Sequence, residues 1–175
     1  YLETYLNVLG NSVVWKKNTQ GKYQASIDVK LTLKQGQVVK YQDKYTLLSP
    51  ESEDTLTIYN FLDQQRILLA AGHYEYSLAI ADANRILSAN EKPFETTGFL
   101  DIVMDSTQIF LSDIELLSAF KKTEQKNALS RNGYDLTPLV DNYFGKAVQS
   151  LKYYVEIYNT NKILGDNDYL VTTEI

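Results

Sequence analysis

The segment KYQASIDVKLTLK, residues 22–34, decides the fold class of this chain. Apolar side chains occupy every odd position from Tyr23 to Leu33, and polar side chains occupy the even positions between them. A strict period of two indicates a strand with one buried face and one solvated face. QGQ at 35–37 supplies a glycine turn, and VVKYQDKYTLL at 38–48 is expected to run back as the partner strand. We therefore predict a β-hairpin.

Further strand patterns follow this hairpin at short intervals. FLDQQRILLAAG, 61–72, fits a helix of about three turns as well as a strand, and the turn at its end favours the strand. Residues His73 to Ala81 again place apolar side chains on one face, and two more strands are predicted at Phe99–Met104 and Gln108–Leu116. Closely spaced strands separated by turn residues, with no repeated helical pattern, indicate an all-β antiparallel sandwich.

Composition agrees with a globular β-protein. The chain has 175 residues, 44% of them hydrophobic, and 14 tyrosines, which suit half-buried pleated surfaces. Its net charge is −5, and its 17 basic residues are scattered, so they do not form the basic surface that nucleic acid requires. We expect no nucleic-acid partner.

The chain has no cysteine, which excludes disulfides, thiolate metal sites and cysteine nucleophiles within it. No apolar run approaches the roughly 20 residues of a membrane span. The chain begins at Tyr1 rather than Met, which a removed signal peptide would explain, and so would a trimmed boundary.

A polar, basic segment interrupts the strand pattern at AFKKTEQKNALSRNG, 119–133. It is expected to form a linker and could include a short helix. The predicted organisation is an immunoglobulin-like sandwich at 1–118, a linker at 119–137 and the opening strands of a second β-module at 138–175.

The end of the chain resembles its beginning. Placing Leu2 on Leu151 aligns Tyr5 with Tyr154, and a three-residue deletion in the first turn then aligns Tyr23 with Tyr169. The alternative is chance, since any two amphipathic strands look somewhat alike. If the repeat is real, its open sheet edge offers unpaired N–H and C=O groups to a partner.

Several segments also resemble one protein family. YLETYL at 1–6, YTLLSPE at 45–51, NFLDQQR at 60–66 and GHYEYSLAIADAN at 72–84 are similar to the N-terminal sandwich of GWxTD-domain proteins, as are SDIELL at 112–117, NGYDLTPLV at 132–140 and YVEIYN at 154–159. The resemblance implies tandem immunoglobulin-like modules in an exported, envelope-associated protein of Bacteroidota. The Gly-Trp-x-Thr-Asp motif itself is absent, so the resemblance transfers no catalytic residue.

Catalytic chemistry has little support in this sequence. His73 is the only histidine and is predicted to lie on the surface at the start of a strand. The sequence has no G-x-S-x-G motif that would supply a nucleophilic serine for it to activate. No phosphate-binding glycine loop is present, and no cofactor is expected. Asp63, Asp82 and Glu115 are candidate carboxylates for glycoside hydrolysis, although positions on the surface and at strand ends explain them easily.

Two groups of residues are candidate binding sites. Asp166 and Asp168 in GDND supply oxygen ligands suited to calcium, but the same residues suit an ordinary β-turn. Tyr5, Tyr154 and Tyr158 fall with polar residues on outward strand faces, where a ring either packs normally or contacts a sugar or protein. Tyr74, at a strand start, is predicted to form a tyrosine corner.

These observations lead to a functional hypothesis. The protein is expected to be a non-catalytic interaction or scaffolding module, located in the periplasm, at the outer membrane or outside the cell. The alternatives are a carbohydrate-binding module that uses the outward tyrosines and, third, a hydrolase.

Overall fold

The computed structural model describes residues 1–86, 92–140, 143–146 and 148–174. The chain divides into two compact units, residues 1–103 and residues 104–175. Both units are built mainly from antiparallel strands, so the predicted all-β class is confirmed. Among the described residues, no helix has the length and apolar character needed to cross a bilayer.

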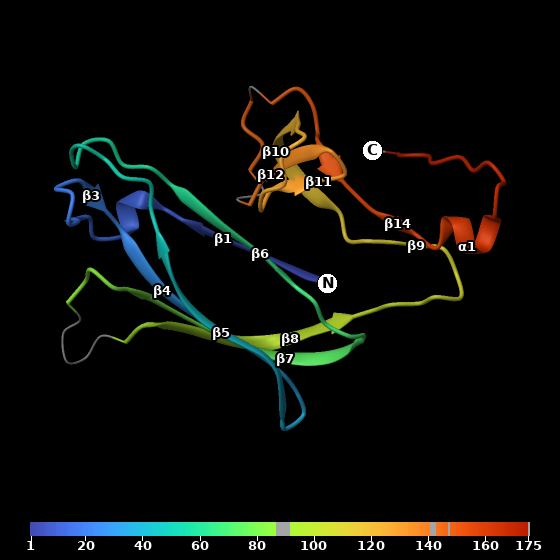
Figure 1. The fold of residues 1–175 in the computed structure, drawn as a ribbon, viewed down its shortest axis with the longest axis horizontal. Coiled ribbons are helices and arrows are strands. Elements are labelled where there is room, and N and C mark those ends of the chain that lie inside the picture. Colours follow the sequence, from blue (N-terminus) through green and yellow to red (C-terminus); the bar gives the residue numbers. More distant parts are fainter. Residues whose placement is uncertain (87–91, 141–142, 147, 175) are drawn as a thin grey trace. The chain divides into compact units, whose positions relative to one another are not determined.

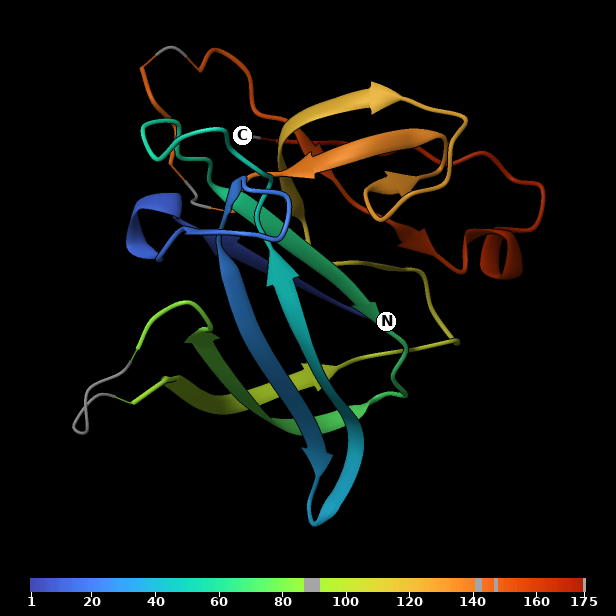
Figure 2. The same ribbon diagram turned by 60° about the vertical axis from the view of Figure 1, so that its left-hand side comes forward.

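In the first unit two sheets form a sandwich (Figure 1). Its elements are β1 (Leu2–Val8), the 3-10 turn η1 (Gly10–Ser12), β2 (Lys16–Lys17), β3 (Tyr23–Gln24), β4 (Ser26–Gln35), β5 (Val38–Leu48), β6 (Phe61–Ile67), β7 (Gly72–Asp82) and β8 (Phe94–Ile102). One layer is the pair β1–β6, and the other has the strand order β5-β4-β7-β8. β2 and β3 form a separate short pair. Figure 2 shows the same two layers from a second direction.

The hairpin predicted from residues 22–48 is confirmed. β4 and β5 pair antiparallel, with Ile27 opposite Leu47, and Gly36 takes a φ of 57° in the turn between them. That left-handed backbone favours glycine because it has no Cβ. The odd-numbered side chains of β4 face the other sheet, and Ala25, just before the strand, is buried with them. β6 is a strand and not a helix, as the turn after it indicated.

The space between the two sheets is filled by two hydrophobic clusters. In the first, Val8 and Phe61 from the small sheet pack with Ile27 and Val29 from β4. The second contains Leu33, Ile67, Leu69 and Tyr74. Each such side chain contributes roughly 1.5–3 kcal/mol on burial, so these clusters are the main source of the unit's stability.

Tyr74 forms the predicted tyrosine corner. Its side chain is 1% exposed, and its hydroxyl donates a 2.9 Å hydrogen bond to the backbone carbonyl of Ala70, four residues upstream. In immunoglobulin-like domains this motif lies at the corner between strands E and F. β1 and β6 accordingly correspond to strands B and E, and β5, β4, β7 and β8 correspond to C′, C, F and G. The immunoglobulin-like sandwich is thus confirmed.

The second unit has shorter elements. They are β9 (Phe110–Leu111), β10 (Glu115–Lys122), β11 (Ser130–Arg131), β12 (Tyr134–Pro138), β13 (Tyr153–Tyr154), β14 (Ile157–Tyr158) and the helix α1 (Thr160–Leu164). One sheet has the order β11-β12-β10-β13, and β14 pairs with β9. Its buried hydrophobic side chains, among the described residues, are Leu117 and Leu136.

The segment predicted as a linker contains no helix. Residues 119–137 lie largely in a β-hairpin, in which β10 pairs with β12 and Phe120 lies opposite Leu136. The end of β10 is exposed along consecutive residues, so its sequence lacks the alternation that identified the earlier strands. The observed division after Val103 also precedes the predicted boundary at Ser118, which lies inside β10.

The C-terminal repeat is only partly reproduced in the structure. Both copies begin with β-structure, and η1 in the first copy aligns with α1 in the second. The segment aligned with the strand at Tyr23, residues 169–174, has no regular secondary structure. β13 and β14 pair with β10 and β9, so they do not open a separate sheet.

Candidate functional site

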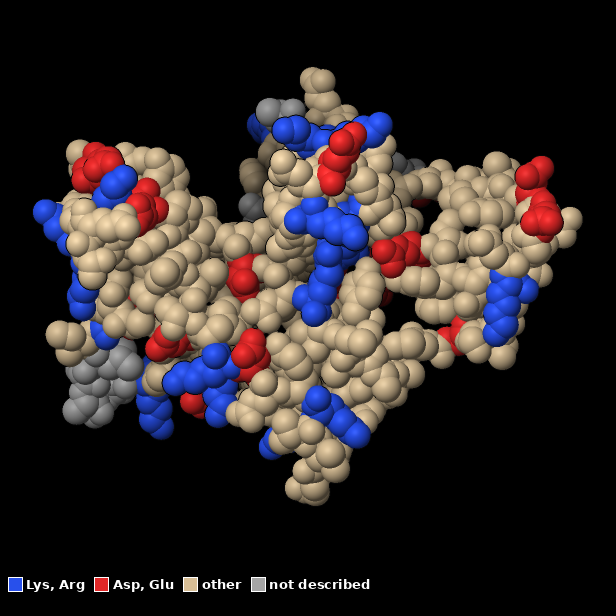
Figure 3. All heavy atoms as spheres, in the orientation of Figure 1, with Lys and Arg blue, Asp and Glu red and all other residues tan. Residues whose placement is uncertain are grey.

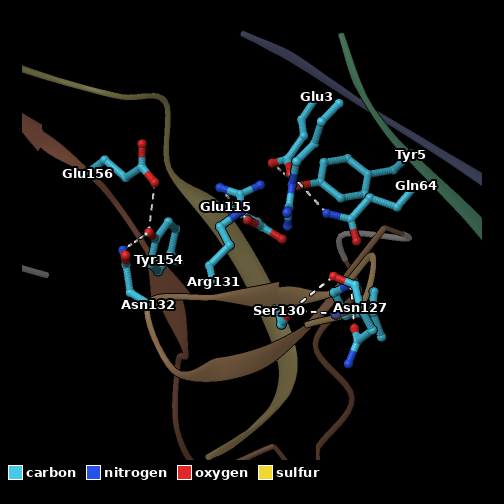
Figure 4. Close-up of polar contacts among 12 residues, drawn as sticks. Glu3, Tyr5, Gln64, Glu115, Asn127, Ser130, Arg131, Asn132, Tyr154 and Glu156 are labelled. Carbon is cyan, nitrogen blue, oxygen red and sulfur yellow. Dashed lines mark hydrogen bonds and ion pairs between the residues drawn. The ribbon is translucent and has the colours of Figure 1, made fainter. Parts of the chain in front are cut away.

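Tyr5 lies on the outward side of the small sheet, within a network of polar side chains (Figure 4). Its hydroxyl donates a 2.7 Å hydrogen bond to Oε2 of Glu3. The other oxygen, Oε1, accepts from Arg66 Nε at 2.6 Å and from Gln64 Nε2 at 2.9 Å. Glu3 and Arg66 are direct cross-strand partners, so this network links β1 to β6.

Tyr154 and Tyr158 come together around one carboxylate in the second unit. The Tyr154 hydroxyl donates to Oε1 of Glu156 at 2.8 Å, and the Tyr158 hydroxyl donates to Oε2 of the same side chain. Residues 154, 156 and 158 are two positions apart, as the strand pattern requires for side chains on one face. Glu156 therefore links β13 to β14 by bridging the two tyrosines.

Residues from other elements complete this cluster. Asn132, in the turn between β11 and β12, donates from Nδ2 to the Tyr154 hydroxyl at 2.7 Å (Figure 4). The guanidinium carbon of Arg131 lies 5.3 Å from the centroid of the Tyr154 ring, within cation–π range. The Phe110 ring lies 4.9 Å from the Tyr158 ring at 30°. We call Phe110, Arg131, Asn132, Tyr154, Glu156 and Tyr158 the tyrosine cluster.

The tyrosine cluster has two consequences for the predicted binding residues. Its contacts join β9, the β11–β12 turn, β13 and β14, which is what ordinary packing of the two tyrosines would achieve. Both hydroxyls already bond to Glu156, and each ring has a neighbour on one side. Of the three predicted residues, Tyr154 and Tyr158 lie together in the second unit, and Tyr5 belongs to the first unit.

Asp166 and Asp168, the calcium candidates, lie in an exposed segment after α1. Gly165 there has a φ of 60°, and Asn167 closes the turn by donating its backbone N–H to the Leu164 carbonyl at 3.2 Å. Within the described ranges, no group of three or more His, Asp or Glu side chains converges to hold a metal ion. The local geometry supports the turn interpretation.

The carboxylates considered for glycoside hydrolysis are bonded to neighbouring groups of the fold. Asp63 accepts a hydrogen bond from the Tyr45 hydroxyl, and burial of Tyr45, followed by this bond, raises the pKa of the phenol well above its usual value. Asp82 accepts from the backbone N–H of Val14 at 2.7 Å and of Asn84 at 2.9 Å.

Glu115, the third candidate carboxylate, lies 3.8 Å from Nη1 of Arg131 within the second unit. All three carboxylates thus contact groups that the fold itself positions.

His73 lies on the surface at the start of β7, as predicted. Its Nδ1 is 2.7 Å from Oδ1 of Asp101, the residue directly opposite on β8. Its ring stacks on Phe99, with centroids 5.3 Å apart. The histidine therefore belongs to a cross-strand surface contact.

Sequence reasoning missed the role of Glu156 and the exposure of the C-terminal segment. The Y-x-E-x-Y spacing at 154–158 was the available signal for Glu156, because it places one carboxylate between two phenols on one strand face. At 169–171, Tyr169, Leu170 and Val171 are exposed, and Leu170 is 89% exposed. These side chains were expected inside a strand.

Charge on the surface is mixed. Figure 3 shows basic and acidic side chains interspersed over the face in view. Comparisons of the chain with protein-family models, with curated proteins and with solved structures find no match. Function is therefore proposed from the geometry and from the sequence resemblance described above.

Proposed function

We propose that this protein is a non-catalytic interaction or scaffolding module of a bacterial cell envelope, and that it binds a protein partner through its C-terminal segment. The observation that carries this proposal is the exposure of Tyr169, Leu170 and Val171 in a segment without regular secondary structure. Consecutive exposed apolar side chains are unfavourable in water, and a contiguous apolar patch typically marks an interaction surface.

The segment is suited to binding by strand addition. Tyr169, Val171 and Thr173 alternate with Leu170 and Thr172, and β-branched and aromatic residues favour extended structure. The Tyr153 and Thr173 hydroxyl oxygens lie 2.6 Å apart, so the segment contacts β13, the end strand of its sheet. An extended segment beside a sheet edge offers main-chain hydrogen bonds to a partner strand.

The proposed location outside the cytoplasm is supported by the resemblance to exported GWxTD-domain proteins. The test is fractionation of the organism that produces the protein, followed by immunodetection. Recovery in the periplasm, the outer membrane or the medium is expected, and recovery in the cytosol would contradict the proposal.

Partner binding is tested with the double variant Leu170→Ser/Val171→Ser. The matched control is Leu68→Ser, because Leu68 is 88% exposed but lies in the first unit. Wild type and control are expected to cross-link to the same envelope protein, and the double variant is expected to lose that product. Equal cross-linking by all three proteins would refute a role for this segment.

Carbohydrate binding is a second candidate, favoured by the aromatic rings, guanidinium, amide and carboxylate of the tyrosine cluster. Glycan-array binding that is lost in Tyr154→Ala and Tyr158→Ala, and kept in the exposed control Tyr143→Ala, would support it. Array binding that is unchanged in both cluster variants, or no binding at all, would eliminate it. A hydrolase is not proposed, given the structural contacts of Asp63, Asp82 and Glu115.

A further inference from the structure

The outer face of the four-stranded sheet has an ordered distribution of side chains. Even-numbered residues of β4 and odd-numbered residues of β7 point away from the core, since their neighbours in sequence form the hydrophobic clusters. The register defines three rows across β5, β4, β7 and β8: Val39–Lys34–Glu75–Phe99, Gln42–Thr32–Ser77–Thr97 and Lys44–Lys30–Ala79–Glu95.

These rows divide the face by charge. Lys30, Lys34 and Lys44 lie on the β4 and β5 half, whereas Glu75 and Glu95 lie on the β7 and β8 half. Asp28 is an exception on β4, and it accepts a 2.7 Å hydrogen bond from the Thr46 hydroxyl on β5. The middle row contains only uncharged polar side chains, so it lets another flat surface approach closely.

One feature of this face is unfavourable in a single copy of the chain. Lys30 and Lys44 are direct cross-strand partners. Like charges directly opposite each other destabilise an antiparallel pair. A carboxylate approaching from outside the sheet would relieve this repulsion.

From this arrangement we propose that the outer face is self-complementary, and that a second copy of the chain binds there around a two-fold axis parallel to the strands. This operation places the β5 side of one copy against the β8 side of the other, within the same row. Lys44 then faces Glu95, and Lys34 faces Glu75. A two-fold axis perpendicular to the strands would instead bring Lys30 against Lys34 of the other copy.

The same two-fold axis also pairs the apolar side chains of the face. Val39 is 47% exposed and Phe99 is 69% exposed, and they occupy opposite ends of one row. The two-fold axis places Val39 of each copy against Phe99 of the other. In the middle row Gln42 faces Thr97, and both are exposed hydrogen-bonding side chains, whereas Thr32, which faces Ser77, is only 9% exposed. Stacked sheets are rotated by about 30°, an offset that long Lys and Glu side chains can span.

The size of the face indicates a weak dimer. Four strands spaced about 4.8 Å apart and three rows spaced about 6.7 Å apart give roughly 400 Å² per copy. This lies below the roughly 800 Å² per partner of a standard interface, so association is expected at high protein concentration. The inference goes beyond the proposed function, because it uses the first unit and needs no part of the C-terminal segment.

The experiment is sedimentation velocity of the full chain across the micromolar to millimolar range. Lys44→Glu alone and Glu95→Lys alone each place like charges together twice in the symmetric dimer, so each is expected to weaken association at least about tenfold. Mixing the two variants restores both Lys–Glu contacts, and the mixture is expected to form a heterodimer. Misfolding of either variant cannot produce that rescue.

The matched controls are Lys126→Glu and Glu124→Lys, exposed reversals in the second unit, which are expected to dimerise as wild type does. Added salt is expected to weaken the wild-type dimer, since exposed ion pairs are screened. A monomeric wild type at millimolar concentration, single reversals that dimerise normally, or a mixture that stays monomeric would each overturn the proposal.

Discussion

The two units achieve their folds by different means. In the first, β4 and β5 extend over 10 and 11 residues, and side chains from both sheets meet in an apolar core. In the second, β13 and β14 have 2 residues each, and polar side chains link the segments. Asn159, for example, donates from Nδ2 to the backbone carbonyls of Asp105 and Gln108 at 2.6 and 2.8 Å.

The two kinds of contact differ in how much each one contributes to the free energy of unfolding. A buried apolar side chain contributes roughly 1.5–3 kcal/mol, whereas an intramolecular hydrogen bond contributes about 1 kcal/mol net. We therefore expect the second unit to open at lower denaturant concentration than the first. The predictions below test this contrast, beginning with the largest effect.

Tyr74→Ala is expected to have the largest effect. It removes a ring that is 1% exposed from the second hydrophobic cluster, and should lower the unfolding free energy of the first unit by about 3–5 kcal/mol. Leu136→Ala, the matched change in the second unit, should cost about 2 kcal/mol. Urea unfolding followed by circular dichroism measures both. Equal costs would contradict the contrast.

Tyr74→Phe distinguishes the contribution of the corner hydrogen bond from that of the ring packed in the core. It keeps the ring and removes only the hydrogen bond to Ala70, so a loss of about 1 kcal/mol is expected. If the loss matches that of Tyr74→Ala, the hydroxyl and not the ring dominates at this position.

Gly98→Ala is expected to destabilise the first unit by about 1–3 kcal/mol, measured in the same urea experiment. A Cβ at this position would lie 2.7 Å from Cε1 of Tyr76, its cross-strand partner. In a Tyr76→Ala background the added methyl group meets no ring, so its cost should largely disappear. An unchanged cost in that background would mean that the ring is not the obstacle.

Glu156→Gln tests the second unit. The carboxylate accepts from both tyrosine hydroxyls, whereas an amide is neutral and has only one oxygen, so one contact is lost and the other is no longer charge-assisted. A loss of about 1–2 kcal/mol is expected, seen as faster amide hydrogen exchange at residues 153–158. Glu124→Gln, in an exposed turn, is the control, and equal exchange in both variants would refute the role of the cluster.

Tyr45 is expected to have the smallest effect, confined to high pH. Its folded pKa lies above the ordinary value of 10.0, chiefly through burial and then through Asp63. Above about pH 10 the unfolded chain loses a proton that the folded chain keeps, so stability falls as pH rises. Tyr45→Phe should show a shallower fall between about pH 10 and 12. Parallel curves would show that this phenol does not contribute.

The sequence predicted those parts of the fold that depend on local periodicity. Alternation over residues 22–34 identified β4 and its buried face, and Tyr74 after a turn identified the corner. The hairpin of β10 and β12 was missed because its exposed strand end has no buried face to create a pattern. Residues 169–174 were predicted as a strand, yet a strand also requires a pairing partner, which no local pattern specifies.

The binding residues were less predictable than the fold. Outward positions for Tyr5, Tyr154 and Tyr158 followed from strand alternation. Their partners did not, because Asn132 and Phe110 are far from Tyr154 and Tyr158 in sequence. Contacts of this kind depend on how distant strands pair, and a single sequence does not encode that in a readable pattern.

The tyrosine corner also bears on the conditions under which this domain can fold. Sandwiches of this type in antibodies carry a disulfide between the two sheets, and that bond requires an oxidising compartment. Here the packing of Tyr74 and the aliphatic side chains of the two clusters holds the sheets together, and the chain has no cysteine. Refolding of the first unit should therefore proceed at the same rate and to the same extent with or without a reducing agent.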